Sequence, residues 1–358
     1  MWRRTWAEWG APATAVNMRV FSYNEFQRAL LLAPAELLIL DEAHYAKNFG
    51  ADRTRESLGA AHTARQVWAL SGTPEPNNPG ELYPILRAVW PDYLRELGVD
   101  SKDSFDARFC KVRQGRWGPK VVGSRNEREL QGLLTRMMLV RDWAEVGSQL
   151  PPLRYDHVQL NVSPEDFRRI KEREAGLEWD AKLQQVFGHD EVKAAMWSTL
   201  GDVKAPLVSE IIADELRDGA YEKIVVFAYH LDVLTYLEEH LQDFGVMRYD
   251  GSLNETQRTI AEREFQENEH YRVFLGQLQA AGHAITLTSA HEVALVEQMW
   301  APMDNHQAVK RIHRIGQGLA CRARVFSLPG TMDEKQQRSL VNKLNMIEAT
   351  LPETQEVL

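Results

Sequence analysis

The chain has 358 residues, of which 44% are hydrophobic and 26% are charged, and its formal net charge is −9. This length suits two domains of ordinary size, each large enough to bury a core. The negative charge excludes an overall basic nucleic-acid-binding protein, so any contact with nucleic acid must come from local basic patches.

Cysteine usage and hydropathy predict a cytoplasmic protein with no membrane partner. Cys110 and Cys321 are far apart and lack metal-ligand spacing, which is typical of reduced thiols. The most apolar stretch, residues 30–40, is too short to span a bilayer, and residues 1–10 contain no apolar signal core. We expect the cytosol of a bacterial or phage-type host, with the nucleoid as an alternative location.

A run of four apolar residues, Leu37 to Leu40, is followed directly by Asp41 and Glu42. Such a run is typical of a strand buried on both faces of a parallel sheet. Its carboxyl end is where open α/β sheets bind ligands. In nucleotide hydrolases, one acid there holds Mg²⁺ and the other orients the attacking water. Alone, the two acids are equally consistent with a strand that ends in a polar turn.

The first 150 residues are predicted to form an α/β lobe. Residues 18–23 and 66–70 are further candidate strands, and a helix is expected over residues 52–64. This strand–helix–strand order is the parallel α/β signature. Residues 101–150 are predicted to be mostly helical, with a basic insert at residues 111–120.

A lobe boundary is expected at residues 150–152, because Leu-Pro-Pro cannot continue a helix. Residues 151–222 are predicted to form a linker and helical brace, and residues 223–358 a second α/β lobe. In the last two segments we expect strands at 154–162, 223–227, 246–249, 271–275, 285–287, 293–299 and 323–327, and helices at 164–188, 191–217, 231–244, 254–266, 305–313 and 331–351.

Two arginines on the last-but-one predicted helix are candidate phosphate ligands. Arg311 and Arg314 lie three residues apart, so a helix would place them on one face. Guanidiniums that reach a γ-phosphate raise the rate of hydrolysis by about 10³ to 10⁵. Alone, the pair is better explained as a solvated helix face, and the segment Ser71 to Pro74 as a simple turn. Their order along the chain, after the two acids, favours a nucleotide hydrolase.

The combined motifs resemble those of the Swi/Snf-type superfamily 2 DNA-dependent ATPases and helicases, over nearly the whole chain. Residues 41–44 match motif II, the Walker B or DEAH box, and residues 71–74 match motif III. Residues 279–290 are similar to motif V and residues 307–317 to motif VI. Residues 105–134 resemble the annealing-helicase branch of the family.

The resemblance implies an α/β fold of two RecA-like parallel-sheet lobes with helical insertions. Residues 1–150 would be the ATP-binding lobe with motifs Ia, II and III, and residues 223–358 the C-terminal lobe with motifs IV, V and VI. ATP and Mg²⁺ would bind between the lobes, and double-stranded or branched DNA would lie across both. The implied activity is ATP-dependent DNA translocation in DNA remodelling, replication or repair.

Each candidate site residue takes its role from the matching motif. Asp41 would hold Mg²⁺ and Glu42 would be the general base. Arg311 and Arg314 would be arginine fingers, and Gln307 would support the phosphate site. The remaining candidates are His44, Ser71 and Thr73 for coupling the ATP and DNA sites, and Thr286, Ser289, Arg116 and Trp117 for binding DNA.

One family motif does not occur in these 358 residues: the phosphate-binding Gly-x-x-x-x-Gly-Lys-[Ser/Thr] loop, or Walker A. In the family this loop precedes the segment that residues 1–9 resemble, so we expect the first lobe to be N-terminally incomplete. We predict a truncated or split translocase with no ATPase activity alone, and a separate chain is a candidate source of the loop. The alternative is a non-catalytic DNA-binding or regulatory module that retains the helicase fold. An RNA helicase of the Asp-Glu-Ala-His type fits the Arg-Ile-Gly-Gln ending of motif VI less well.

Overall fold

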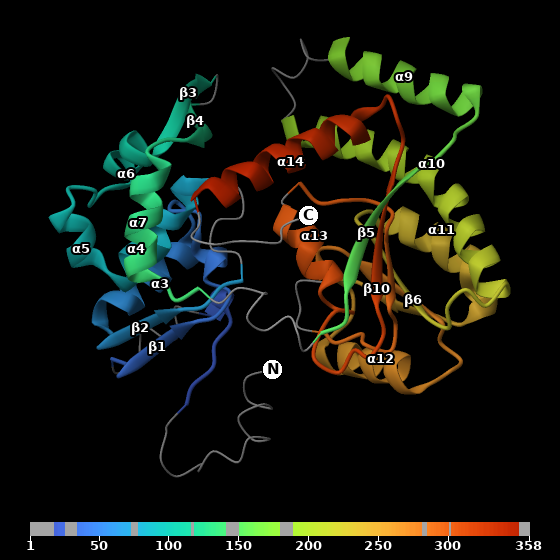
Figure 1. Cartoon of the computed structure of the whole chain (residues 1–358), viewed down its shortest axis with the longest axis horizontal. Helices are drawn as coiled ribbons and strands as arrows, with labels where there is room; N and C mark the ends of the chain where they lie inside the picture. Colours follow the sequence, from blue (N-terminus) through green and yellow to red (C-terminus); the bar gives the residue numbers. More distant parts are fainter. Residues whose placement is uncertain are drawn as a thin grey trace. The chain divides into compact units, whose positions relative to one another are not determined.

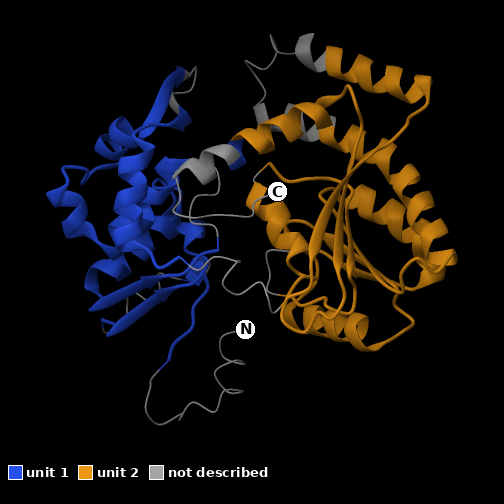
Figure 2. Cartoon of the chain, in the orientation of Figure 1, with its two compact units in different colours: residues 1–142, 343–357 blue, residues 143–342, 358 orange. Residues whose placement is uncertain are grey.

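The computed structural model describes residues 18–25, 34–72, 78–115, 118–140, 150–179, 189–280, 285–300 and 302–350. Two compact units divide the chain (Figure 2). Unit 1 contains residues 1–142 and 343–357, and unit 2 contains residues 143–342 and 358. The division therefore differs from the boundary expected at residues 150–152, and the segment expected to be a separate linker and brace belongs to unit 2.

The sheet of unit 1 has two described strands in parallel, β1 (Leu37–Leu40) and β2 (Gln66–Ala69), joined by helix α3 (Asp52–Thr63). This confirms the strand–helix–strand prediction. One sheet face packs into a small core on α3 and the next helix, formed by Leu38, Leu40, Val67, Ala69, Ala61, Ile85 and Ala88.

The strand expected over residues 18–23 is not formed. Residues 18–22 are irregular, and a 3₁₀ turn, η1 (Tyr23–Glu25), follows them. The Ser22 hydroxyl donates to the Glu25 carboxylate at 3.0 Å, and this local bond favours a turn over extended pairing.

The rest of unit 1 is helical apart from one antiparallel ribbon. After the 3₁₀ turns η2 (Ala43–Ala46) and η3 (Pro79–Glu81) come α4 (Leu82–Val89), α5 (Pro91–Glu96), α6 (Lys102–Phe109) and α7 (Glu127–Met137). The basic insert, expected inside a mostly helical segment, forms the ribbon of β3 (Cys110–Gly115) and β4 (Gly118–Ser124). The ends of the ribbon adjoin α6 and α7, whose Phe105, Phe109, Leu130 and Leu134 are buried.

Unit 2 contains a six-stranded sheet in which every pair is parallel, in the order β5-β10-β9-β6-β8-β7 (Figure 1). The strands are β5 (Leu153–Gln159), β6 (Ile224–Ala228), β7 (Val246–Tyr249), β8 (Val273–Gln277), β9 (Glu292–Leu295) and β10 (Cys321–Ser327). All five residues of β6 are buried, as expected for a strand covered on both faces. The predicted α/β class is confirmed.

Helices cover both faces of this sheet and form two cores. One core joins the sheet to α10 (His189–Arg217) and α11 (Leu231–Leu241), and the other joins it to α12 (Glu255–Glu267) and α13 (Pro302–Val309). The unit is completed by α9 (Pro164–Trp179), the 3₁₀ turn η6 (Gln242–Phe244) and α14 (Met332–Thr350), whose last residues are assigned to unit 1. No helix among the described residues is long and apolar enough to cross a membrane.

The strand expected at residues 285–287 is not formed, because its backbone donors bond to loops and to a helix. The Leu287 N–H donates to the Arg311 carbonyl, and the Thr286 N–H donates to the Glu262 carboxylate. These two N–H groups are therefore used outside any strand ladder, and the segment is a loop beside the sheet.

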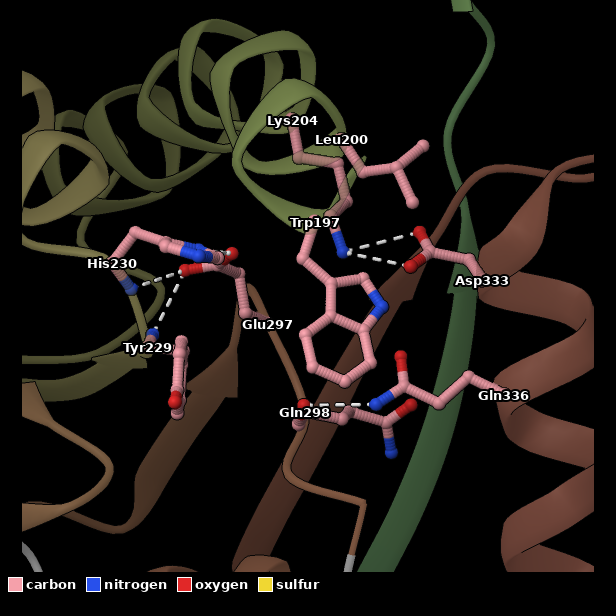
Figure 3. A pocket seen from close by; sticks show the side chains of 9 residues that line it. All are labelled: Trp197, Leu200, Lys204, Tyr229, His230, Glu297, Gln298, Asp333 and Gln336. Carbon is pink, nitrogen blue, oxygen red and sulfur yellow. Dashed lines mark hydrogen bonds and ion pairs between the residues drawn. The ribbon is translucent and has the colours of Figure 1, made fainter. Parts of the chain in front are cut away.

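A buried ion pair joins α14 to α10. Lys204 Nζ lies 3.1 Å from an Asp333 carboxylate oxygen, and the two side chains are only 3% and 7% exposed (Figure 3). Asp333 also accepts the Leu328 N–H at 3.1 Å. The pair therefore fixes the first turn of α14 against the long helix α10.

We predict that Lys204→Ala lowers the free energy of unfolding by about 3–5 kcal/mol, because it leaves the Asp333 charge buried without its counter-ion. Urea denaturation would measure the change. The matched control is Arg338→Ala, which breaks an exposed ion pair with Glu334 on the same helix and should cost less than about 1 kcal/mol. Equal small losses in both variants would contradict the prediction.

Candidate functional site

In unit 1 the parallel ladder continues past the ends of both strands. The Leu70 N–H donates to the Leu40 carbonyl at 2.8 Å, and the Ala43 N–H donates to the Leu70 carbonyl at 2.9 Å. These bonds place Asp41 and Glu42 beside Ser71, which follows β2. The structure therefore brings together two acids and a hydroxyl that are about thirty residues apart in the sequence.

Glu42 has a left-handed backbone, with φ 49° and ψ 51°. Its N–H donates to Asp41 Oδ1 at 3.1 Å. A left-handed residue other than glycine is uncommon, and such strain clusters at functional sites. The conformation turns the chain sharply from β1 into η2, which carries His44.

His44 connects the acids to the turn after β2. Its Nδ1 lies 3.0 Å from Ser71 Oγ and 3.3 Å from Glu42 Oε2. Burial of the ring, and secondarily the charge of Lys47, lower the pKa of His44 to about 4. The imidazole is therefore neutral near pH 7, hydrogen-bonds to Ser71 and lies close to the Glu42 carboxylate.

Tyr23 is a neighbour that the motifs did not predict. Its hydroxyl donates to the Asp41 carbonyl at 2.9 Å. Burial raises the pKa of Tyr23 well above its ordinary value, and the charges of Asp41 and Glu42 raise it further. The hydroxyl is therefore a permanent donor to the backbone of the acid pair. Thr73, Arg116 and Trp117, which were also predicted as site residues, lie outside the described residues.

In unit 2 the predicted helix 305–313 is shorter than expected, because α13 ends at Val309. The chain continues in tight turns, in which the Arg311 N–H donates to the Ala308 carbonyl and the Ile312 N–H to the Val309 carbonyl. The expectation that Arg311 and Arg314 share a helix face is therefore wrong. Arg311 is 5% exposed and Arg314 is half-buried, while Gln307 lies half-buried on α13 itself.

Arg314 reaches the loop that carries the motif V hydroxyls. Its Nη1 lies 3.5 Å from Thr286 Oγ1, and its Nε donates to the Lys310 carbonyl at 3.2 Å. Residues on α12 hold the same loop: Glu262 accepts the Thr286 N–H, and Gln266 accepts the Ser289 N–H, each at 2.7 Å. The structure thus brings predicted motif V and motif VI residues together within unit 2.

Gln317 ties these two loops to each other. Its Nε2 donates to the carbonyls of Thr288, Ala290 and Ile312 at 2.8–3.1 Å, and its Oε1 accepts the Leu319 N–H. Gln317 closes the predicted motif VI, which was the available signal for its importance. The sequence pattern did not indicate that Glu262 and Gln266 hold the motif V loop. They are two of many polar residues on α12, and none of the quoted motifs includes them.

Glu297 binds the residues that follow β6 at the carboxyl end of the six-stranded sheet. It follows β9 and accepts the N–H groups of Tyr229 and His230 at 2.8 and 2.9 Å, and His230 Nδ1 at 2.7 Å (Figure 3). The cavity beside it is about 10 Å³, enough for one water molecule. A cavity of about 480 Å³ lies beyond β7 and β8, bordered by Arg248, Ser252 and Gln277.

Two family models match the chain. The SNF2-related domain matches residues 22–196, and the helicase conserved C-terminal domain matches residues 206–316. The chain belongs to the SNF2-related helicase family. Motifs II and III fall within the first matched segment, and motif V and all but the last residue of motif VI fall within the second.

Similar SNF2-related proteins are much longer than these 358 residues. The SWI/SNF-related matrix-associated actin-dependent regulator of chromatin subfamily A-like protein 1 of Xenopus laevis is 30% identical over 96% of this chain and 36% of its own length. The human DNA annealing helicase and endonuclease ZRANB3 is 29% identical over 88% of this chain and 30% of its own length. The Sulfolobus solfataricus SWI2/SNF2 ATPase core, solved in complex with dsDNA, matches at 22% identity and a TM-score of 0.46 over 91% of this chain and 71% of that chain. The chain spans about a third of the length of these curated relatives.

The acids of this SNF2-related chain fit Mg²⁺ only in company with a nucleotide. Among the described residues, no group of three or more His, Cys, Asp or Glu side chains could hold a metal ion. Mg²⁺ in nucleotide sites is usually held by one or two carboxylates together with phosphate oxygens and water. Asp41 and Glu42 at the end of β1 provide such a partial ligand set.

The lowered pKa of His44 predicts a pH dependence of stability. Above its ordinary pKa of 6.5, the neutral ring of His44 makes its full contribution to the free energy of unfolding. This contribution is lost as the pH falls toward about 4, because the unfolded chain then binds the proton more readily than the folded chain. We expect the wild type to lose stability relative to His44→Gln between pH 6.5 and pH 4. Chemical denaturation across this range measures the difference. His62→Gln, at an exposed position on α3, is the control and should show no such trend. A His44→Gln difference that is constant with pH would contradict the prediction.

Proposed function

We propose that the chain acts within an ATP-dependent DNA translocase, as the part that holds the catalytic acids and the arginine fingers. The observation that carries the proposal is the contact of His44 with both Glu42 and Ser71. It links a candidate water-orienting acid to the motif III turn. A polar turn at the end of a strand would not need a buried neutral imidazole between the acid and the turn.

In this proposal Asp41 holds Mg²⁺ together with the phosphates of ATP, and Glu42 accepts a proton from the attacking water. When bound, the ion neutralises charge on the phosphate oxygens. Arg311 and Arg314 stabilise the charge that develops on the γ-phosphate, and Gln307 supports the phosphate site. The approach of these arginines to the acids stays a prediction.

DNA binding is proposed for the loop that contains Thr286 and Ser289, and for Arg116 and Trp117. Hydroxyl groups contact phosphates without reading sequence. The bond between Arg314 and the Thr286 hydroxyl supports a direct link between a phosphate ligand of ATP and a DNA contact. We propose that this link and His44 couple nucleotide state to DNA contact, one in each unit.

The phosphate cradle is proposed to come from a polypeptide segment outside these 358 residues, in the same polypeptide or in a separate chain. The sheet of unit 1 supports this proposal, because one face exposes apolar side chains: Leu37, Ile39, Trp68 and Leu70 are 37–55% exposed. Parallel sheets are normally covered on both faces. A segment that brings the phosphate-binding loop would also cover this face.

We predict that the 358-residue chain alone hydrolyses little or no ATP, and that adding the phosphate-loop segment produces DNA-stimulated hydrolysis. Glu42→Gln should abolish this activity, because the amide cannot accept the proton. Glu36→Gln, on an exposed residue just before β1, is the matched control and should leave the activity unchanged. Steady-state phosphate release with and without duplex DNA is the measurement.

Two outcomes would contradict this account. DNA-stimulated hydrolysis by the 358 residues alone, abolished by Glu42→Gln, would refute the need for another segment. A completed assembly that binds DNA but never hydrolyses ATP would favour the second candidate function, a non-catalytic DNA-binding or regulatory module. The observation that favours this second candidate is the lack of a phosphate-binding loop in these residues.

A further inference from the structure

The chain enters unit 2 through a stiff segment that contains two consecutive prolines. The long first stretch of unit 1 ends at residue 142, and unit 2 begins at residue 143. Pro151 and Pro152 each have φ fixed near about −65°, and a residue before proline is restricted to extended conformations. Strand β5 begins directly after them, at Leu153. From Pro151 onward the chain therefore moves with unit 2 as one body.

Both proline carbonyls accept hydrogen bonds from the region of motif VI. His313 Nε2 lies 2.7 Å from the Pro151 carbonyl oxygen, and the Cys321 N–H donates to the Pro152 carbonyl at 2.8 Å. His313 lies in the turns between the two candidate arginine fingers, and Cys321 begins β10, the next element. The entry to unit 2 is therefore attached to the segment that carries the arginines.

Packing holds the same entry segment against α13. Leu153 and Tyr155 of β5 pack against the core that includes Ile312 and residues of α13. The Tyr155 hydroxyl also lies 3.2 Å from Nδ1 of His306 on α13. The entry segment and the arginine segment therefore form one packed body within unit 2, in which the bond from His313 is the contact made next to the arginines themselves.

The neighbours of His313 fix the tautomer of its ring. Lys310 Nζ lies 3.1 Å from His313 Nδ1. An ammonium group can only donate hydrogen bonds, so Nδ1 is the acceptor and the proton of the neutral ring is on Nε2. This proton is donated to the Pro151 carbonyl. His313 is only 6% exposed, so the bond is directional and shielded from water.

We propose that His313 is a positioning residue that fixes the chain entering unit 2 to the segment that carries Arg311 and Arg314. A displacement of the chain that reaches Pro151 is then passed to the arginines through one buried hydrogen bond. In the reverse direction, arginines held by a phosphate hold the entry segment in place. The inference rests on the proposed function, in which the two arginines stabilise the γ-phosphate of ATP.

Two substitutions of His313 separate positioning from a general loss of packing. The side-chain nitrogen of glutamine reaches the place of Nε2, whereas that of asparagine reaches only the place of Nδ1. His313→Gln can therefore still donate to the Pro151 carbonyl, and His313→Asn cannot.

The kinetic test uses the chain completed with the phosphate-loop segment, in the presence of duplex DNA. We expect His313→Asn to lower kcat for ATP hydrolysis at least about tenfold, since small displacements of groups that act on the reaction cost up to about 10²-fold. The KM for ATP should change less than about twofold, because the arginines act on charge that develops in the transition state. His313→Gln should recover most of kcat.

A second measurement needs neither ATP nor the added segment. Hydrogen exchange of the Cys321 amide in the 358-residue chain reports on its bond to the Pro152 carbonyl. Local opening sets the rate of such exchange. We expect His313→Asn to accelerate it at least about tenfold, and His313→Gln to keep it close to that of the wild type.

The matched control is Thr331→Val, which removes another buried side-chain donor to a carbonyl in unit 2. The Thr331 hydroxyl donates to the Leu328 carbonyl at 2.7 Å. This control should leave both kcat and the exchange of the Cys321 amide unchanged. In addition, Pro151→Gly keeps the carbonyl but frees the backbone. Combined with His313→Asn, it should lower kcat no further than the larger single effect, because both act through the same attachment.

The outcomes separate this inference from the proposed function. Wild-type kcat or wild-type Cys321 exchange in His313→Asn overturns the inference and leaves the translocase proposal standing. Equal losses in Thr331→Val overturn it in favour of general destabilisation. A loss that His313→Gln does not recover, or additive losses with Pro151→Gly, overturn it in favour of a separate role of the imidazole. A completed wild-type assembly that hydrolyses no ATP overturns both proposals.

Discussion

The parallel ladder between β1 and β2 is the constraint on which the candidate site of unit 1 depends. Because it continues one step beyond each strand, through the Leu70 and Ala43 N–H groups, the acids of one strand end beside the turn of the other. His44 can then contact Glu42 and Ser71 at the same time. Without this register the same residues would be separate polar turns.

In unit 2 the candidate loops also follow the carboxyl ends of parallel strands, but here side chains bind the backbone groups of the loops. At the carboxyl ends of its strands, backbone donors and acceptors are satisfied by side chains: Glu297 holds the residues after β6, and Gln317 holds the two motif loops. Buried polar groups left without partners cost about 1–3 kcal/mol each. These side chains therefore stabilise loops whose shape would otherwise be undetermined, and they keep Arg314 close to Thr286.

At Glu42 a strained backbone coincides with a proposed catalytic role. A left-handed conformation costs an L-residue about 1–2 kcal/mol, and glycine would adopt it freely. Glu42 nevertheless occupies this position, with its carboxylate beside His44. The strain is understandable if the carboxylate is needed for chemistry, which is the assumption of the proposed mechanism.

Most of the fold follows from local pattern, because buried parallel strands are short apolar runs that end in polar residues. β1 with its acids and the fully buried β6 could be predicted as strands in this way. The expectation that β1 is buried on both faces is wrong, because Leu37 and Ile39 are 37% and 41% exposed. The end of α13 at Val309 could not be predicted, because residues 310–313 contain no helix-breaking residue. These residues form turns that depend on tertiary hydrogen bonds, such as the bond from the Leu287 N–H to the Arg311 carbonyl. The irregular segment 285–287 was missed for the same reason, since its N–H groups bond to residues far away in sequence. The β3–β4 ribbon was missed because its strands contain basic residues, glycine and proline, which are a weak strand signal.

The central claim is that the acids of unit 1 and the arginines of unit 2 meet at one ATP molecule. Its most direct test is a pulsed-EPR distance measurement between two spin labels attached to cysteines introduced at Arg55 on α3 and Arg263 on α12. Both positions are exposed, whereas the natural cysteines Cys110 and Cys321 are buried. The chain would carry Glu42→Gln and be completed with the phosphate-loop segment. The account predicts that ATP with Mg²⁺ shifts the distance distribution to one narrow population, and that adding Arg314→Ala weakens this shift. Identical distributions with and without ATP, or a shift that Arg314→Ala leaves unchanged, would contradict it.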